Sequence, residues 1–427
     1  MDEMLQVHLW TIAAASLCAV SCALLGTYLV LRKLSLLGDA ISHAILPGLA
    51  MAFLLTGSRH PLPMFLGAAF FGLLTAFLSQ FLTRFCRVDQ GASLGVVFTT
   101  FFALGVLLIR MAADHIDLDP GCVLYGLLEY TPLYTVVVGG MEIPRSILVL
   151  LPMLLVNIAF ISLLYKELQI TAFDPALATT VGINATVVHS LLMTAVASTS
   201  VASFESVGSI LVVAMFIIPP ATARLLTDRL LTTLLLSALF GLISAVAGYG
   251  FAVQINTSVA GMMSVVAAGL FFAALIFSPR YGVISRSIQR LRLQLRVLSE
   301  DILGLAFRCQ ERDFVRSFPL TARNIGSAMG GGLAPRFAIR RLVREQLIEH
   351  VSDGSYRLTA SGEAQAKRLI RSHRLWETFL VQHLKLSPDH VHQTATTLEH
   401  YTTPEMEGAL KQKTGGAGVD PHGKVIP

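Results

Sequence analysis

The chain has 427 residues, of which 54% are apolar and only 14% are charged, whereas about 25% of an ordinary soluble domain is charged. This composition excludes a soluble globular fold for most of the chain. The charge is unevenly divided, because residues 1–278 hold 10 basic and 13 acidic side chains while residues 279–427 hold 22 and 14. A nearly uncharged part followed by a basic part indicates two regions that face different solvents.

Nine apolar runs in the first part are long enough to cross a bilayer, since a membrane helix needs about 20 mainly apolar residues. Lys and Arg concentrate in alternate short loops, which predicts that these loops and the C-terminal tail lie in the cytoplasm. The expected fold is therefore an all-α multi-pass membrane domain. Its spans are expected at residues 8–31, 35–55, 62–83, 92–113, 146–165, 187–204, 208–227, 230–253 and 259–278.

Two ionisable residues stand inside the second span. Asp39 and His43 are four apart and so share one face of the helix. Charged groups in a membrane are costly and normally face a water-filled path or a partner. A carboxylate and an imidazole can replace the hydration shell of a first-row divalent metal, and a mutual hydrogen bond that fixes helix packing is the alternative. His115, Asp117 and Asp119 in an outside loop could also gather cations, although acidic surface loops are common.

A short helix is expected between spans five and six. Asp174 is placed to cap its start, Pro175 fits its first position and Gly182 fits the residue beyond its end. Such a capped cytoplasmic helix is suited to docking another protein. The alternative is an ordinary loop helix that lies on the membrane surface.

Three segments carry a resemblance to a known family. They are residues 31–48 (LRKLSLLGDAISHAILPG), the Phe173–Asp174–Pro175 segment and residues 212–226 (VVAMFIIPPATARLL). In this order they are similar to the zinc, manganese and iron class of ABC importer permeases, and the similarity runs through residues 1–278. In that family two permeases form the pore, a separate ATPase binds the cytoplasmic loops and an external binding protein delivers the metal.

The resemblance implies a permease of the bacterial plasma (inner) membrane that imports Mn, Zn or Fe and is not itself an enzyme. The second permease chain can be an identical or a different one. By the resemblance, Asp39 and His43 are residues of the translocation path. The residues implied for ATPase coupling are Phe173, Asp174, Pro175 and Gly182.

From residue 279 the pattern changes. Residues 279–298 are expected to form a basic linker helix with five arginines and no acid, which favours anchoring against anionic lipid over nucleic-acid binding. Residues 299–360 have the layout of a winged helix-turn-helix domain. Helices are expected at 302–307, 321–329 and 334–349, a glycine turn at 330–332, and a hairpin wing at 347–359. The third helix is basic and suits DNA, through Arg336, Arg340, Arg341 and Arg344.

Residues 361–427 are expected to form a helical metal-binding and dimerisation domain. His373 and Glu377 are four apart, and His392 precedes Glu399 by two turns with His400 adjacent. Imidazoles and carboxylates on neighbouring helices suit Mn, Fe, Zn or Co, and no thiol is present to select softer metals.

A second resemblance covers residues 299–427 and is carried by SHRLWE at 372–377, LEHY at 398–401 and DPHGKVIP at 420–427. These segments are similar to the iron- and manganese-dependent repressors. The resemblance implies a first ligand set of Asp301, His373, Glu399 and His400, and a second site that includes Glu377 and His392. Thr396 and Gly304 depart from the family, because each stands where family members have a ligand.

The sequence therefore predicts a divalent-metal permease fused to a metal-responsive winged-helix module. Two alternatives stay open. One is a membrane-tethered or released repressor whose permease half no longer transports, and the other is a cytoplasmic gate that senses metal without binding DNA. The segment at 418–424 has P-loop spacing, but Val425 replaces the Ser or Thr that follows the lysine, so no ATPase is expected in this chain.

Overall fold

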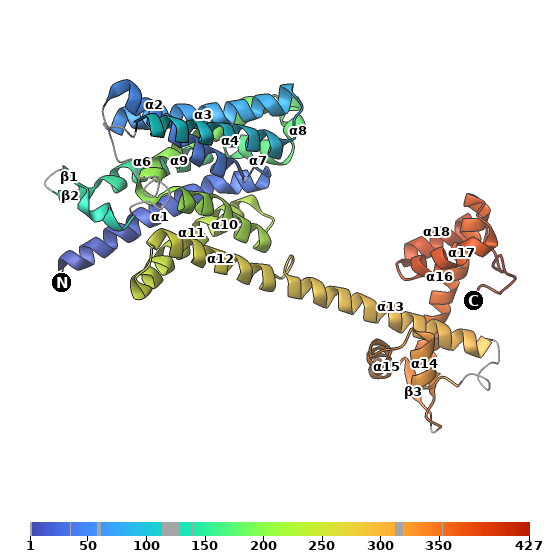
Figure 1. Cartoon of the computed structure of the whole chain (residues 1–427). Coiled ribbons are helices and arrows are strands. Elements are labelled where there is room, and N and C mark those ends of the chain that lie inside the picture. The colour runs from blue at the N-terminus through green and yellow to red at the C-terminus, as the bar shows by residue number, and fades with distance from the viewer. Residues whose placement is uncertain are drawn as a thin grey trace. The chain divides into compact units, whose positions relative to one another are not determined.

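The computed structural model describes residues 2–34, 36–57, 61–112, 128–138, 141–311, 319–351 and 353–427. The chain divides into two compact units, Met1–Ser285 and Arg286–Pro427, and both are mainly helical (Figure 1). The loop residues His115, Asp117 and Asp119 lie outside the described residues.

Nine helices in the described part of the first unit are long and apolar enough to cross a membrane, which confirms the number of spans expected from hydropathy. They are α1 (Asp2–Leu31), α2 (Leu36–Thr56), α3 (Pro61–Phe85), α4 (Gln90–Ala112), α6 (Arg145–Leu163), α9 (Ala185–Val207), α10 (Ser209–Leu226), α11 (Leu230–Ile255) and α12 (Val259–Phe277). The other described elements of this unit are η1 (Leu128–Leu133), the hairpin of β1 (Thr135–Val138) and β2 (Met141–Pro144), and the short helices α7 (Tyr165–Phe173) and α8 (Pro175–Thr180).

Helix α1 is central to the first unit and packs against α6, α9, α10 and α11 (Figure 1). Its buried side is built from small residues, and Ala15, Cys18, Ala19 and Cys22 are all fully buried. Small side chains let membrane helices approach closely. At Gly26 the approach is closest, because a Cβ there would collide with the backbone of α10.

The apolar stretch between α8 and α11 is divided by Gly208. This residue has a φ of +77° and is both the C-cap of α9 and the N-cap of α10. Glycine tolerates this left-handed conformation because it has no Cβ. The break turns one long apolar run into the two spans that the sequence predicted there.

The second unit begins within α13 (Val283–Glu311). It continues with α14 (Ala322–Ala328), α15 (Ala334–Arg344), β3 (Ile348–His350), β4 (Tyr356–Leu358), α16 (Ala360–Leu384), α17 (Pro388–Glu399) and α18 (Pro404–Lys413). Strands β3 and β4 pair antiparallel, with Ile348 opposite Leu358. This order is a winged helix-turn-helix followed by a helical domain, so the predicted fold class is confirmed. The finer boundaries at 278, 298 and 360 stay predictions.

One predicted helix end was wrong. The third helix of the tail was expected to reach Glu349, but α15 ends at Arg344 and Glu349 lies in β3. Gln346 has a φ of +56°, which stops the helix, and the next residues are needed to pair with β4. The glycine turn before α15 is as expected, because the three glycines at 330–332 all have positive φ values.

Candidate translocation path and metal centre

Asp39 and His43 lie one turn apart on α2, as their spacing predicted. Oδ1 of Asp39 is 3.4 Å from Nε2 of His43, and the two side chains are 44% and 21% exposed. Phe98 and Phe102 of α4 meet the imidazole edge-on, with ring centroids 4.9 and 5.3 Å away. The pair is thus half-buried, with an aromatic wall on the side of α4.

Nδ1 of His43 is a buried nitrogen that has no hydrogen-bond partner among the described residues. Buried polar groups are normally satisfied, so a ring nitrogen without a partner, on an imidazole beside a carboxylate, is a candidate cation ligand. Asp39 is the more exposed of the two, so its carboxylate is open to a hydrated ion while His43 lies deeper. That Asp39 and His43 line a cation path, and that they form a hydrogen bond which only fixes helix packing, both stay predictions.

Helix α8 is capped as the sequence predicted. Oδ1 of Asp174 accepts hydrogen bonds from the backbone N–H groups of Ala176 and Leu177 at 2.9 and 3.0 Å. Pro175 occupies the first position, and Gly182 follows the C-cap with a φ of +90°. Apolar side chains on and beside this short helix are exposed: Phe173 at the end of α7 is 59% exposed, Leu177 of α8 is 52% and Val181 at its C-cap is 64%.

Arg32 at the end of α1 joins the elements on both sides of α8. Its guanidinium donates to Oγ1 of Thr171 in α7 at 2.6 Å and lies 3.1 Å from Nδ1 of His189 in α9. The ends of α1, α7 and α9 are therefore held together where α8 leaves the bundle. Nothing in the sequence pairs His189 with Arg32, 157 positions away.

In the second unit, His373 and Glu377 of α16 meet His392 of α17. Nε2 of His373 lies 3.1 Å from Oε1 of Glu377, and Nδ1 of His392 lies 2.9 Å from the same oxygen. Burial opposes the charged carboxylate, but hydrogen bonds from His373 and His392 lower the pKa of Glu377 to about 2. Two imidazoles and one carboxylate thus converge within the reach of a single ion.

Asp301 of α13 meets Glu399 and His400 at the end of α17. Nε2 of His400 lies 3.2 Å from Oδ1 of Asp301 and 3.8 Å from Oε1 of Glu399. Its Nδ1 lies 2.7 Å from Oε2 of Glu300. Burial opposes a charged imidazole, but the bonds to Asp301 and Glu300 raise the pKa of His400 to about 9. This group too has the ligand atoms that a divalent metal requires.

His373 connects the two groups, because its Nδ1 lies 2.5 Å from Oε2 of Glu399 while its Nε2 faces Glu377. All six predicted metal residues therefore belong to one continuous cluster. The structure groups these ligands differently from the family resemblance. The resemblance placed His373 in the first ligand set, whereas in the structure His373 lies between the two groups. Which ion each residue would ligate stays a prediction.

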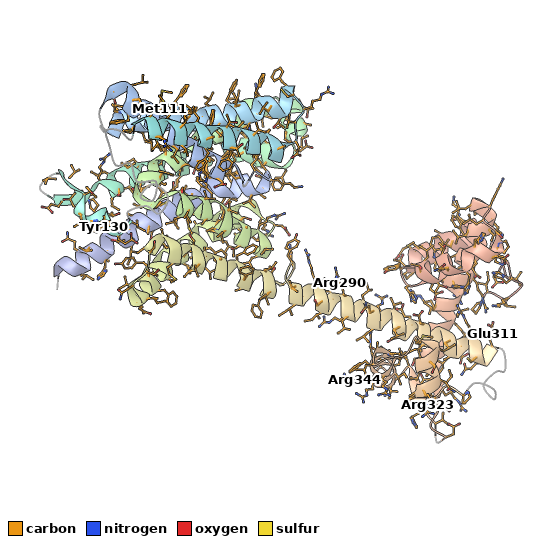
Figure 2. The ribbon with its side chains drawn as sticks, viewed as in Figure 1. Met111, Tyr130, Arg290, Glu311, Arg323 and Arg344 are labelled. Carbon is orange, nitrogen blue, oxygen red and sulfur yellow. The ribbon has the colours of Figure 1, made fainter. Side chains whose placement is uncertain are left out.

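Several neighbours of this cluster were missed by sequence reasoning. Glu300 was one, although it directly precedes Asp301. Arg374 is another: its buried guanidinium donates to both carboxylate oxygens of Glu311 at 2.9 and 2.6 Å, and it also bonds the carbonyl of Val425. Figure 2 labels Glu311 near the end of α13.

The C-terminal segment covers one side of the cluster. Nε2 of His422 lies 3.9 Å from Oε1 of Glu377. His422 and Glu377 line a pocket of about 870 Å³ together with His373, His392 and Asp420. The sequence had marked this segment only as part of a family resemblance, because no spacing rule links residue 422 to residue 377.

The two departures from the repressor pattern add no ligand. The hydroxyl of Thr396 donates to the carbonyl of His392 one turn earlier, at 2.9 Å. A Cβ at Gly304 would face the apolar side chains of Leu369 and Ile370. The cluster therefore rests on the six predicted residues and their neighbours.

The arginines of α15 differ in their exposure and ion pairing. Arg336, Arg340 and Arg344 recur every four residues and are exposed, whereas Arg341 is tied to Glu345 by an ion pair of 2.8 Å. Figure 2 shows Arg344 and, on the neighbouring α14, Arg323 extending from their helices. Three exposed arginines on one helix face are the pattern of a nucleic-acid contact.

These features define a multi-pass membrane protein of the permease type, followed by a helical domain in which imidazoles and carboxylates converge. Residues 3–278 match the ABC 3 transport family, and residues 359–427 match the iron dependent repressor, metal binding and dimerisation domain. The chain belongs to the ABC 3 transport family. The fusion of a permease with a repressor-type domain, which both resemblances had predicted, is confirmed.

Similar proteins agree with this assignment. The manganese transport system membrane protein MntD of Bacillus subtilis is 46% identical over 286 residues, which covers 67% of this chain and 97% of that protein. A probable metal transport system membrane protein of Chlamydia trachomatis is 30% identical over 451 residues, covering 99% of this chain and 96% of that protein. Among solved structures, PsaBC from Streptococcus pneumoniae in complex with Fab is 30% identical with a TM-score of 0.54, covering 64% of this chain and 92% of that chain.

Proposed function

We propose that the chain is the permease subunit of an ATP-driven importer of divalent Mn, Zn or Fe, and that its C-terminal domain responds to such a metal. The observation that carries the transport proposal is the Asp39–His43 pair, half-buried in a span, in which the buried Nδ1 of His43 has no hydrogen-bond partner among the described residues. The substrate ion would bind the carboxylate of Asp39 and the imidazole of His43 on its way through the span. Membership in the ABC 3 family and the likeness to MntD support this reading.

The partners follow from the family. A separate ATPase would dock on α8 and its flanking residues through the exposed side chains of Phe173, Leu177 and Val181. An extracytoplasmic binding protein would deliver the metal to the opposite side of the bilayer, and a second permease chain, identical or different, would complete the pore. The distribution of Lys and Arg supports a cytoplasmic tail in a bacterial plasma membrane.

The tail would hold its resident metal with Asp301, His373, Glu399 and His400, and with Glu377 and His392. Their imidazoles and carboxylates fit Mn, Fe or Zn, and a bound divalent ion would supply a charge that ties three helices together. The ligands must lose their protons first, and His400 in particular would give up the proton that Asp301 and Glu300 hold on it.

A regulatory role is supported by the winged helix beside this cluster. The exposed face of Arg336, Arg340 and Arg344 favours operator DNA as the partner of the tail. The arginines of α13 suit contact with anionic lipid headgroups. A gate that senses metal without binding DNA is the competing role, and the DNA measurement in the Discussion separates the two.

Uptake of radioactive Mn, Zn and Fe by vesicles tests the transport proposal. The vesicles would contain the chain with its ATPase and binding protein, and ATP would be supplied on the side of the ATPase. We expect uptake of at least one of the metals that requires both ATP and the binding protein. Vesicles that hydrolyse ATP without accumulating any of the three metals would rule out the proposal.

A further inference from the structure

The first half of α13 presents a continuous apolar stripe to solvent. Ile284, Ile288 and Leu291 are 43%, 45% and 55% exposed, and Leu295 follows on the same face at intermediate exposure. The spacings between these residues are four, three and four, which is the alternation of a heptad repeat. A stripe only two side chains wide is the seam of a coiled coil, because a helix that packs on a broad surface needs a wider apolar face.

The apolar stripe continues along α13 into a part where it is buried. Leu298 continues it and packs against the core of the winged-helix domain, and Ile302, the next position, is fully covered there. The apolar positions of the repeat are therefore buried within the tail from Leu298 onward, whereas those before Leu298 have no described partner. The winged-helix domain packs on this same side of α13 from Leu298 onward. It would therefore obstruct a flat lipid surface, which argues against lipid as the partner of the stripe.

We propose that residues 284–295 of α13 form a parallel two-stranded coiled coil with the same segment of a second copy of this chain. Two copies inserted in one membrane with the same topology begin α13 at the same level, so the segments run parallel and in register. Ile288 then takes an a position and Leu291 a d position, the combination that favours two strands, whereas Leu295 at a and Ile284 at d are the reverse combination. The number of strands follows instead from the two permease chains that complete one pore in the proposed function. The proposal deepens the regulatory role of the tail, on which it rests.

The positions of the arginines on α13 are compatible with a second copy of the same helix as the partner. Arg286, Arg290 and Arg296 fall at f, c and b positions, which point away from the seam. Arg292 falls at an e position, where the residue opposite it in a parallel pair is Ser287 at g. No like charges meet across the seam, although residues 280–299 contain five arginines and no acid.

A second contact between the two chains, through the C-terminal domain, would support a coiled coil of this short length. Residues 359–427 match a metal binding and dimerisation domain, and they lie in the same compact unit as Ile288, Leu291 and Leu295. A coiled coil of about two heptads is weak alone, since short helices are marginal in water. Two chains that already meet through another contact hold their seams at a high effective concentration, so a short seam is sufficient.

Cysteine cross-linking in the full chain tests the seam. In native membranes, with Cys86, Cys122 and Cys309 replaced by serine, single cysteines would be placed at Ile284, Ile288, Leu291 or Leu295. Controls would carry a cysteine at Arg286 or Leu293, which are f positions. We expect mild oxidation to give disulfide-linked dimers from the seam positions and not from the controls. No dimer from the seam, or equal dimer from the f positions, would overturn the proposal.

Leu291 and Leu293 provide a matched second test, because they are the same residue type, two positions apart, and 55% and 46% exposed. In a background with the cysteine at Ile284, Leu291→Glu should lower the cross-linked fraction roughly tenfold or more, as expected for burying a charge in place of an apolar side chain. Leu293→Glu should leave it unchanged, and equal effects would refute the seam. The readout needs neither ATP, metal nor partner subunits, so a chain that cross-links but does not transport would refute the transport role and leave this interface standing.

Discussion

At the scale of single residues, Asp39 brings a carboxylate into a span whose other residues are almost all apolar. We expect Asp39→Asn to reduce metal uptake by about 10-fold or more, since altering even the residues that orient metal ligands costs about 10- to 100-fold. His43→Gln should act in the same direction, because it removes the imidazole. The measurement is uptake in vesicles at equal membrane abundance of the permease.

Asp89→Asn is the matched control for this test. Asp89 accepts a hydrogen bond from the backbone of Gly91 at the start of α4, and asparagine can cap a helix in the same way. Uptake by this variant should equal that of the unaltered chain. If Asp39→Asn also leaves uptake unchanged, the pair does not belong to the path.

Glu399 holds the two halves of the metal cluster together, since it is buried and lies near both His373 and His400. We expect Glu399→Gln to weaken metal binding by the full chain about tenfold or more, because a charged ligand is lost. Trp376 provides a readout by fluorescence: it adjoins Glu377, and its indole N–H donates to Thr402 at 2.8 Å.

The exposed Glu349 of β3 offers the control, because Glu349→Gln makes the same change outside the cluster. Its metal titration should match that of the unaltered chain. Unaltered binding by Glu399→Gln would show that the cluster is structural rather than a metal site.

At the scale of elements, α8 has only six residues and depends on its cap. Asp174→Ala removes the acceptor for two backbone N–H groups and should cost on the order of 1 kcal/mol of local helix stability. We expect weaker coupling, measured as lower metal-stimulated ATP hydrolysis by the assembled importer at normal membrane abundance.

Asp174→Asn removes the negative charge but keeps the helix cap, since asparagine caps a helix as well as aspartate does. Hydrolysis close to that of the unaltered chain is expected for this variant. Normal hydrolysis by Asp174→Ala would mean that α8 is not the coupling element.

At the scale of the whole molecule, the metal ligands come from α13, α16 and α17, whereas the exposed arginines lie on α15. An ion that ties three helices can act on DNA only through a higher affinity for the binding-competent arrangement. We therefore expect the full chain in lipid nanodiscs to bind its own promoter DNA only with Mn, Fe or Zn present. His400→Ala should abolish the metal response, and fluorescence anisotropy of labelled DNA measures it.

His390 gives a control on the same helix, because it is exposed and outside the cluster. His390→Ala should preserve the metal response. Binding without metal, or a normal response from His400→Ala, would exclude the sensor role. No binding with any of the three metals would favour the gate that senses metal without DNA.

Much of the architecture followed from the sequence alone, because its causes are local. A span is recognised by about 20 apolar residues, and the cap of α8 is recognised by Asp174, Pro175 and Gly182 standing at fixed offsets. Asp39 and His43 could be paired for the same reason, since residues four apart on a helix share a face. The wing was visible from alternation around a turn, although the end of α15 was misplaced because the backbone of Gln346 is set by the strand that follows.

Only the tertiary structure decided how distant segments meet. The contact of Arg32 with His189, the place of His373 between two metal groups, and the approach of Glu300 and His422 to the cluster each join residues that no sequence period connects. Such contacts depend on how whole helices pack, and packing is determined by shape and burial across the unit rather than by neighbours along the chain. Local pattern therefore determined the helices and their caps, and packing determined which side chains share a site.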